Sequence, residues 1–181
     1  MITRIKNKIY LIKQKFKKII YKRHPYYINI PPSQLVVNWI FQRILRLNSK
    51  VNYSVHFTSK IQGSKNILFD KNDKKIKVSF AGSGGCYFAV FDNTTLEIGS
   101  GTLWACNVCI QTANHDLYNR EKFNLASVKI GKNCWIGNSA TILPGVTLGD
   151  NVTVGANTVV TKSFPSNVVL AGCPAKIIKE L

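Results

Sequence analysis

The stretch "IGKNCWIGNSATILPGVTLGDNVTVGANTVV", Ile130 to Val160, repeats a pattern every six residues. An aliphatic residue opens each unit, namely Ile130, Ile136, Ile142, Leu148, Val154 and Val160. A small or β-branched residue stands four places later, namely Cys134, Ala140, Val146, Val152 and Thr158. A period of six matches neither a helix nor a plain strand. It predicts a parallel β-helix, in which each unit makes one short strand and a turn and both positions point into a narrow core.

The same register continues toward the N-terminus. Its opening residues there are Ile98, Trp104 and Ile110, and more weakly Val55, Ile61, Ile67, Phe80, Cys86 and Asp92, with a polar slip over residues 70–77. Glycine follows the opening residue at positions 99, 131, 137, 149 and 155, where we expect it to support the backbone at the corners. We therefore predict a β-helix domain over residues 51–181.

The repeat stops after His115 and resumes at Ile130. The intervening residues, "DLYNREKFNLASVK", are polar and predict a loop over residues 116–129. A β-helix made only of identical coils has flat faces and no pocket. We infer that the interruption makes a pocket, and that His115 stands at its entrance.

The N-terminal part of the chain is strongly basic. Asp70 is the first acidic residue of the sequence, although the chain carries a net charge of +17. Residues 1–50 are predicted to form a separate helical region. Its first helix would place Ile2, Ile5, Ile9, Ile12, Phe16 and Ile19 on one face. A second helix would be capped by Ser33 and would extend from Leu35 to Leu47.

Two interpretations of these helices remain open. They can pack on the protein itself, which we favour for the second helix, or residues 1–24 can contact an anionic membrane surface. Lysines interrupt every apolar run in the first 24 residues, so no secretory leader is expected. We therefore expect a cytoplasmic protein, with the inner face of the cell membrane as a peripheral location. Nucleic acid is not expected as a partner.

The five cysteines show no paired spacing and predict reduced thiols. Cys106 and Cys109 form a lone C-x-x-C motif without two further ligands nearby, so no metal site is expected.

The repeat, the "TANHD" motif that contains His115 and the "AGCPAKII" segment near the C-terminus together resemble the hexapeptide-repeat acyltransferases. The resemblance is greatest to the sugar and polysaccharide O-acetyltransferases. It implies an all-β fold, a left-handed parallel β-helix with three units per coil, here preceded by N-terminal α-helices. It also implies a homotrimer and acetyl-CoA as the acyl donor.

The resemblance implies roles for individual residues. His115 would be the general base, since a neutral imidazole can take a proton from a sugar hydroxyl near neutral pH. Asp116 or a backbone carbonyl would orient its ring. The backbone N–H of Asn138 would stabilise the oxyanion. The residues expected to bind the donor are Trp135, Asn138, Ala156, Thr161, Lys162 and Lys176.

The acceptor side departs from the small-sugar enzymes, because "GSGGCYFAVFDNTT" stands where they carry a different motif. Asp92 and Asn93 are the candidates for acceptor binding. The expected function is acetyl-CoA-dependent O-acetylation of a carbohydrate hydroxyl in a surface polysaccharide or its precursor. The alternatives are N-acylation of an amino sugar and a non-catalytic trimer that binds membrane or nucleic acid.

Overall fold

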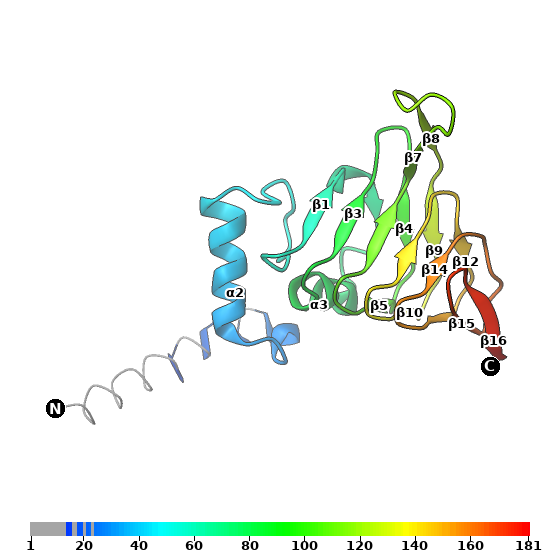
Figure 1. The fold of residues 1–181 in the computed structure, drawn as a ribbon. Coiled ribbons are helices and arrows are strands. Elements are labelled where there is room, and N and C mark those ends of the chain that lie inside the picture. The colour runs from blue at the N-terminus through cyan, green and yellow to red at the C-terminus, as the bar shows by residue number, and fades with distance from the viewer. Residues whose placement is uncertain (1–13, 16–17, 20, 23) are drawn as a thin grey trace.

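The computed structural model describes residues 14–15, 18–19, 21–22 and 24–181. Residues 60–171 wind into a three-sided β-helix of parallel strands (Figure 1). Sheet A contains β1 (Lys60–Gln62), β3 (Tyr87–Ala89), β6 (Cys109–Gln111), β11 (Thr141–Ile142) and β14 (Val159–Val160). Sheet B contains β2 (Ile67–Leu68), β4 (Leu96–Ile98), β9 (Val128–Ile130) and β12 (Thr147–Leu148). Sheet C contains β5 (Leu103–Trp104), β10 (Trp135–Ile136), β13 (Thr153–Val154), β15 (Val168–Ala171) and the antiparallel β16 (Lys176–Glu180).

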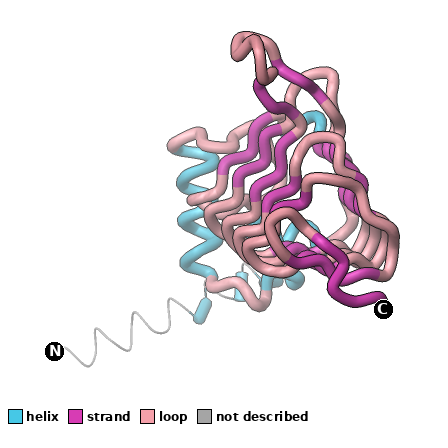
Figure 2. The backbone as a smooth tube through the Cα atoms, turned by 45° about the vertical axis from the view of Figure 1, so that its right-hand side comes forward, coloured by secondary structure: helices cyan, strands magenta, loops and turns pink. Residues whose placement is uncertain are grey.

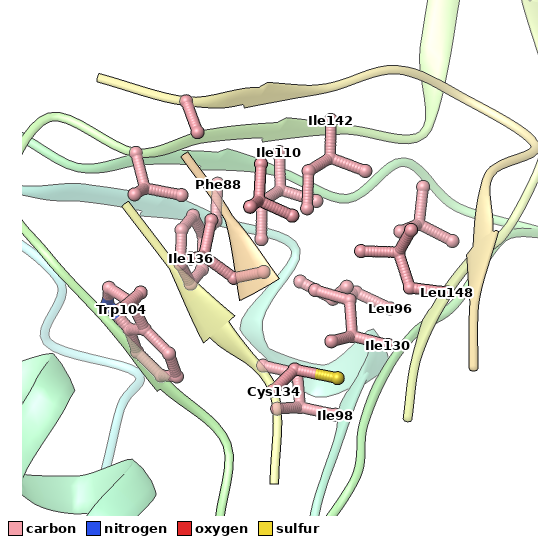
Figure 3. Close-up of a cluster of buried hydrophobic side chains, with 14 of the residues drawn as sticks. Phe88, Leu96, Ile98, Trp104, Ile110, Ile130, Cys134, Ile136, Ile142 and Leu148 are labelled. Atoms are coloured by element: carbon pink, nitrogen blue, oxygen red, sulfur yellow. The ribbon is translucent and has the colours of Figure 1, made fainter. Parts of the chain in front are cut away.

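The core confirms the six-residue pattern from Ile98 onward. Every opening residue is buried, and so is every residue four places later except Asn114, which lies in the interruption. Figure 3 shows side chains from all three sheets meeting in one narrow interior, among them Ile110, Ile130 and Ile136. Register explains this stacking, because Ile136 lies between Trp104 and Val154 in adjacent coils. Each buried aliphatic side chain therefore contacts its equivalents above and below.

The corners of the coils are stabilised differently from the sequence prediction. The left-handed backbone conformation occurs three places after seven of the nine opening residues, at Gly101, Asn107, Asn133, Ser139, Gly145, Asn151 and Asn157. Asparagine tolerates this conformation better than most residues. Gly131, which directly follows an opening residue, is not left-handed, but a Cβ there would collide with the backbone of Gly149 in the next coil. Its glycine is needed for the close approach of coils.

The first coil contains a helix that the repeat did not predict. Helix α3 (Lys74–Gly82) contains the second half of the polar slip and includes Phe80, which is therefore not an opening residue of the repeat. It takes the place of a sheet C strand beside β5, since Ser79 Oγ accepts a hydrogen bond from the Trp104 N–H and Ser83 Oγ donates one to the Trp104 carbonyl. Asp92 is exposed rather than inward-facing.

Asp73 joins α3 to the following coil. Its Oδ1 accepts hydrogen bonds from the backbone N–H groups of Lys75 and Ile76, which makes it the N-cap of the helix. Its Oδ2 accepts from Ser100 Oγ at 2.7 Å and from the Gly101 N–H at 2.6 Å. These donors outweigh partial burial and lower the pKa of the Asp73 carboxyl group. One carboxylate thus fixes both the start of the helix and a corner of the β-helix.

The interruption after His115 is a β-hairpin. Strand β7 (Ala113–His115) pairs antiparallel with β8 (Phe123–Leu125). The excursion therefore begins before residue 116 and ends before residue 129, because Val128 is already paired with Leu96 in sheet B. Figures 1 and 2 show the hairpin projecting from one edge of the β-helix.

The N-terminal region differs from the prediction in its boundaries. A 3-10 turn, η1 (Pro25–Tyr27), precedes α2 (Pro32–Trp39), which continues as a π-helical turn, η2 (Ile40–Ile44). Ser33 is not the cap, since Pro31 occupies that position without a side-chain hydrogen bond. The first predicted helix lies mainly outside the described residues. Among those that are described, no helix combines the length and apolar character needed to cross a membrane.

Three amide side chains attach this region to the open end of the β-helix. Asn38 accepts a hydrogen bond from the Phe57 N–H and donates to the Ala81 carbonyl. Gln42 accepts from the Val55 N–H and donates to the Tyr53 carbonyl. Asn48 accepts from the Ile61 N–H and donates to the Ser59 carbonyl. The three amides supply the hydrogen bonds that a preceding coil would make.

We expect Asn157→Ala and Asn157→Gly to have different effects on stability. Residue 157 has a φ of 56°. Alanine in this conformation costs about 1–2 kcal/mol, whereas glycine adopts it freely. Denaturant unfolding at a fixed protein concentration should show that loss for the alanine variant alone. Equal stabilities of the two variants would contradict the assignment of the corner role to the left-handed backbone.

Candidate active site

His115 lies at the end of β7, where the hairpin leaves sheet A. Its side chain is exposed, and its ring is 4.4 Å from the ring of Phe123 on the paired strand. Its Nδ1 is 2.6 Å from the backbone carbonyl oxygen of Arg120. Because a carbonyl only accepts hydrogen bonds, Nδ1 carries the proton and the neutral ring keeps a lone pair on Nε2. The geometry therefore supplies an oriented base.

Asp116 makes its hydrogen bonds within the hairpin and not to the His115 ring. Its Oδ1 accepts hydrogen bonds from the N–H groups of Tyr118 and Asn119, and its Oδ2 accepts from Asn124 Nδ2. These donors, led by the Asn119 N–H, lower the pKa of the Asp116 carboxyl group. The carboxylate thus shapes the hairpin turn. The contact to the His115 ring comes from a backbone carbonyl, the alternative to Asp116 that the sequence left open.

A second feature is the corner between sheets C and A, which we call the C–A corner. Cys106, Asn138 and Ala156 occupy equivalent places there, because β5, β10 and β13 are in register. In residues 24–181, the backbone N–H groups of these three residues donate to no acceptor. The corner between sheets B and C differs, since the Lys132 N–H donates to Asp150 Oδ1 and the Asp150 N–H to Ser166 Oγ. The C–A corner therefore presents a column of available donors.

The residues expected to bind the donor fall into separate groups. Asn138 and Ala156 lie at the C–A corner, and Trp135, 44% exposed, lies on the strand that leads to it. Thr161 and Lys162 follow β14 at the opposite edge of sheet A, the edge from which the hairpin leaves. Lys176 begins β16, the outermost strand of sheet C. All of these side chains are exposed, and Asn138 Nδ2 donates a hydrogen bond to the Cys106 carbonyl.

The strands of sheet A begin at the C–A corner and end at the side where the hairpin leaves, and these two sides are apart within one chain. After the turn at residues 156–157, the backbone runs extended through β14 to Thr161, which corresponds to roughly 10 Å. His115 belongs to the Thr161 edge, and the free N–H groups belong to the other. The structure of one chain thus does not bring the predicted base and the predicted oxyanion donor together.

The acceptor candidates lie one coil before His115. Asp92 is 3.1 Å from Lys65 Nζ, and this ion pair lowers the pKa of its carboxyl group. Asn93 occupies a turn with a φ of 65°. Neither contacts His115 directly. The connection is aromatic, because the Phe91 ring is 5.3 Å from that of Phe123, which in turn contacts His115.

Sequence reasoning missed Phe91, Phe123 and the carbonyl of Arg120. The two aromatic residues stand in "VFDN" and "EKFNL", and only the pairing of β7 with β8 makes their proximity to His115 apparent. A backbone carbonyl carries no signal in the sequence.

Comparisons with known proteins support the fold and the repeat. The family model described as "Bacterial transferase hexapeptide (six repeats)" matches residues 127–162. Galactoside O-acetyltransferase of Escherichia coli K12 is 40% identical over 97 residues, which cover 51% of this chain and 47% of that protein. A putative lipopolysaccharide biosynthesis O-acetyl transferase, WbbJ, of the same organism is 29% identical over 158 residues, 77% of this chain and 76% of that one.

Among solved structures, the hexapeptide-repeat acetyltransferase VCA0836 of Vibrio cholerae superposes with a TM-score of 0.54 at 24% identity, covering 82% of this chain and 86% of that one. Together with the six-residue core pattern, this likeness defines the protein as a left-handed parallel β-helix. The chain carries the bacterial transferase hexapeptide repeat over residues 127–162, and it is similar to O-acetyltransferases over 51% to 77% of its length. It spans about half the length of the galactoside O-acetyltransferase that it matches.

Nitrogen NMR of the histidine rings should identify the tautomer of His115. We expect the neutral ring to carry its proton on Nδ1, because the Arg120 carbonyl accepts from that atom. The Asp116→Ala variant should keep this tautomer, although its hairpin turn is weakened. A change to the Nε2–H tautomer in that variant would show that Asp116 orients the ring.

Proposed function

We propose that the protein is an acetyl-CoA-dependent O-acetyltransferase that acts on a carbohydrate hydroxyl of a surface polysaccharide or its precursor. The observation that carries this proposal is the oriented, exposed His115 ring, whose Nε2 is free to accept a proton. The names of the relatives, a galactoside O-acetyltransferase and a putative lipopolysaccharide biosynthesis O-acetyl transferase, support the reaction and the class of acceptor.

His115 would act first as base and then as acid. Its Nε2 takes the proton of the acceptor hydroxyl as that oxygen attacks the carbonyl carbon of the thioester. The Arg120 carbonyl stabilises the resulting imidazolium through Nδ1–H. When the carbon–sulfur bond breaks, Nε2 returns the proton to the departing thiolate. The acetyl group has then moved to the acceptor oxygen and His115 is neutral again.

The C–A corner would serve the donor. The free Asn138 N–H would stabilise the negative charge on the carbonyl oxygen, as oxyanion donors do. The free Ala156 N–H would donate to an amide carbonyl of the pantetheine arm, beside the exposed ring of Trp135. Thr161, Lys162 and Lys176 would lie further along the donor, where the lysines can meet its phosphates as point charges.

This assignment requires a second copy of the chain. His115 and the C–A corner lie at opposite edges of sheet A, so we propose that each active site combines the hairpin of one copy with the C–A corner of its neighbour. A homotrimer, the state implied by the family resemblance, would contain three such sites. Asp92 and Asn93 remain predictions for the acceptor side, with Phe91 and Phe123 as the apolar wall between them and His115.

Replacement of the base tests the mechanism. We expect His115→Ala to lower kcat by about 10²–10⁴-fold while the protein still folds and is still stabilised by coenzyme A in thermal unfolding. His56→Ala is the matched control, since His56 stacks on Phe57 and bonds Thr58 away from the hairpin. Wild-type turnover in His115→Ala would refute the proposed role of the histidine.

Mixed oligomers test whether the site is shared. Ala156→Trp should block the donor groove, because residue 156 is exposed and a large side chain there needs no change in the core. Inactive His115→Ala and Ala156→Trp chains, unfolded and refolded together in equal amounts, should regain about a quarter of the wild-type activity, since random mixing restores one site in four. Absence of recovery, with mixed oligomers demonstrated by mass spectrometry, would place each site within one chain.

A further inference from the structure

Residues 38–47, from the end of α2 through η2 and the turn that follows, bury two amide side chains and expose four large apolar ones. Asn38 and Gln42 are 0% and 3% exposed. Large apolar side chains face solvent, namely Trp39 at 57%, Ile44 at 61%, Leu45 at 56% and Leu47 at 51%. We call these four residues the exposed apolar set. Four such residues within nine positions are more than isolated surface hydrophobics, and they indicate an interaction surface.

The charges beside the exposed apolar set indicate the chemistry of the partner. Arg43, Arg46 and Lys50 alternate with these residues along the chain, and the sequence contains no acidic residue before Asp70. Such a surface repels a basic partner and attracts an anionic one. The combination of apolar side chains and cations is typical of segments that lie in the interface of an anionic membrane.

A cavity of about 970 Å³ adjoins this segment. Its basic lining residues are Arg46, Lys50, Lys65, Lys71 and Lys77. The carboxylate in the lining, that of Asp92, is already paired with Lys65. Its aromatic lining includes Tyr53 and Phe69. The excess positive charge fits a phosphate-bearing head group at the side of the exposed apolar set.

The position of the segment leaves its outer side accessible to a partner. It stands at the open end of the β-helix, at the opposite end from β15 and β16 (Figures 1 and 2). The β-helix does not cover its outer side in either view.

We propose that residues 39–50, which include the end of α2, all of η2 and the turn after it, dock on an anionic phospholipid surface. The exposed apolar set enters the interfacial region, while Arg43, Arg46 and Lys50 lie at the level of the phosphates. The sequence left a membrane contact open for residues 1–24, most of which lie outside the described residues. The proposed docking surface is formed by residues 39–50, and this proposal does not depend on the enzymatic activity.

Vesicle co-sedimentation of the full chain tests the proposal. We expect binding to phosphatidylcholine vesicles that contain 30 mol% phosphatidylglycerol, little binding to pure phosphatidylcholine, and weaker binding in high salt. Arg46→Gln and Lys50→Gln should each weaken the association by about fivefold. Replacement of all four residues of the exposed apolar set by serine should abolish it, although residues 1–24 are unchanged.

A matched control and a local probe make the test specific. Leu117→Ser with Tyr118→Ser removes two exposed apolar side chains from the hairpin tip and should bind vesicles like the wild type. Brominated phospholipid should quench the fluorescence of Trp39 in the wild type, and this quenching should vanish in Trp39→Phe. Circular dichroism verifies that each variant is folded.

Two results would overturn the proposal. One is unchanged vesicle binding by the folded four-serine variant. The other is a change in molecular mass of that variant by light scattering, without vesicles, because the exposed apolar set would then lie between copies of the chain.

Discussion

The close stacking of successive coils is the constraint on which the rest of the molecule depends. Adjacent parallel strands lie about 4.8 Å apart, so each coil must place its backbone almost directly over the last. Inside, this requires an aliphatic residue to meet its own equivalent, as Ile136 meets Val154. At the corners, it excludes a Cβ at Gly131, which would enter the backbone of the neighbouring coil. These contacts require similar residues at equivalent positions of each coil, and the six-residue repeat of the sequence meets this requirement.

A structure under this constraint offers few places for chemistry. The strands of the coils bury their inward side chains and pair their backbone groups, so reactive groups arise at interruptions of the repeat and at corners where N–H groups are unpaired. The hairpin of β7 and β8 is one such place, and it holds the ring of His115 against a carbonyl five residues away. The C–A corner is the other, since the N–H groups of Asn138 and Ala156 find no acceptor in the described chain. The proposed active site uses both exceptions.

The part of the fold that obeys the repeat could be predicted from the sequence, and the part that departs from it could not. From Ile98 onward the inward positions are correct, because one physical rule fixes each of them. Phe80 was wrongly assigned as an opening residue because it lies in helix α3, and a helix can also bury a residue that falls six places from another buried residue. Cys86 was wrong as well, because Phe88 is the residue of that coil that aligns with Ile61 and Ile110. Asparagines at the corners were present in the sequence but were not interpreted. Glycine directly after an opening residue was expected for its flexibility, but at Gly131 it is required for its small size.

For the candidate site, the sequence could predict which residues take part but not which atoms they contact. His115 and Asn138 could be named from a motif, but the partner of Nδ1 is a backbone atom that becomes a neighbour through hairpin pairing. The sequence also did not predict that the site is divided between the two ends of the sheet A strands. A residue can be assigned to a corner only when its coil and strand are known. In the first coil that count is disturbed by α3.

The open end of the β-helix connects the fold to the proposed membrane surface. A solenoid must satisfy the backbone groups of its terminal coil or cover them. Here Asn38, Gln42 and Asn48 do so, each with one donated and one accepted hydrogen bond. A helix that turns its amides toward the coil must turn other residues outward, and those include Trp39 and Leu45. The polar cap that ends the β-helix therefore leaves an apolar surface on its outer side.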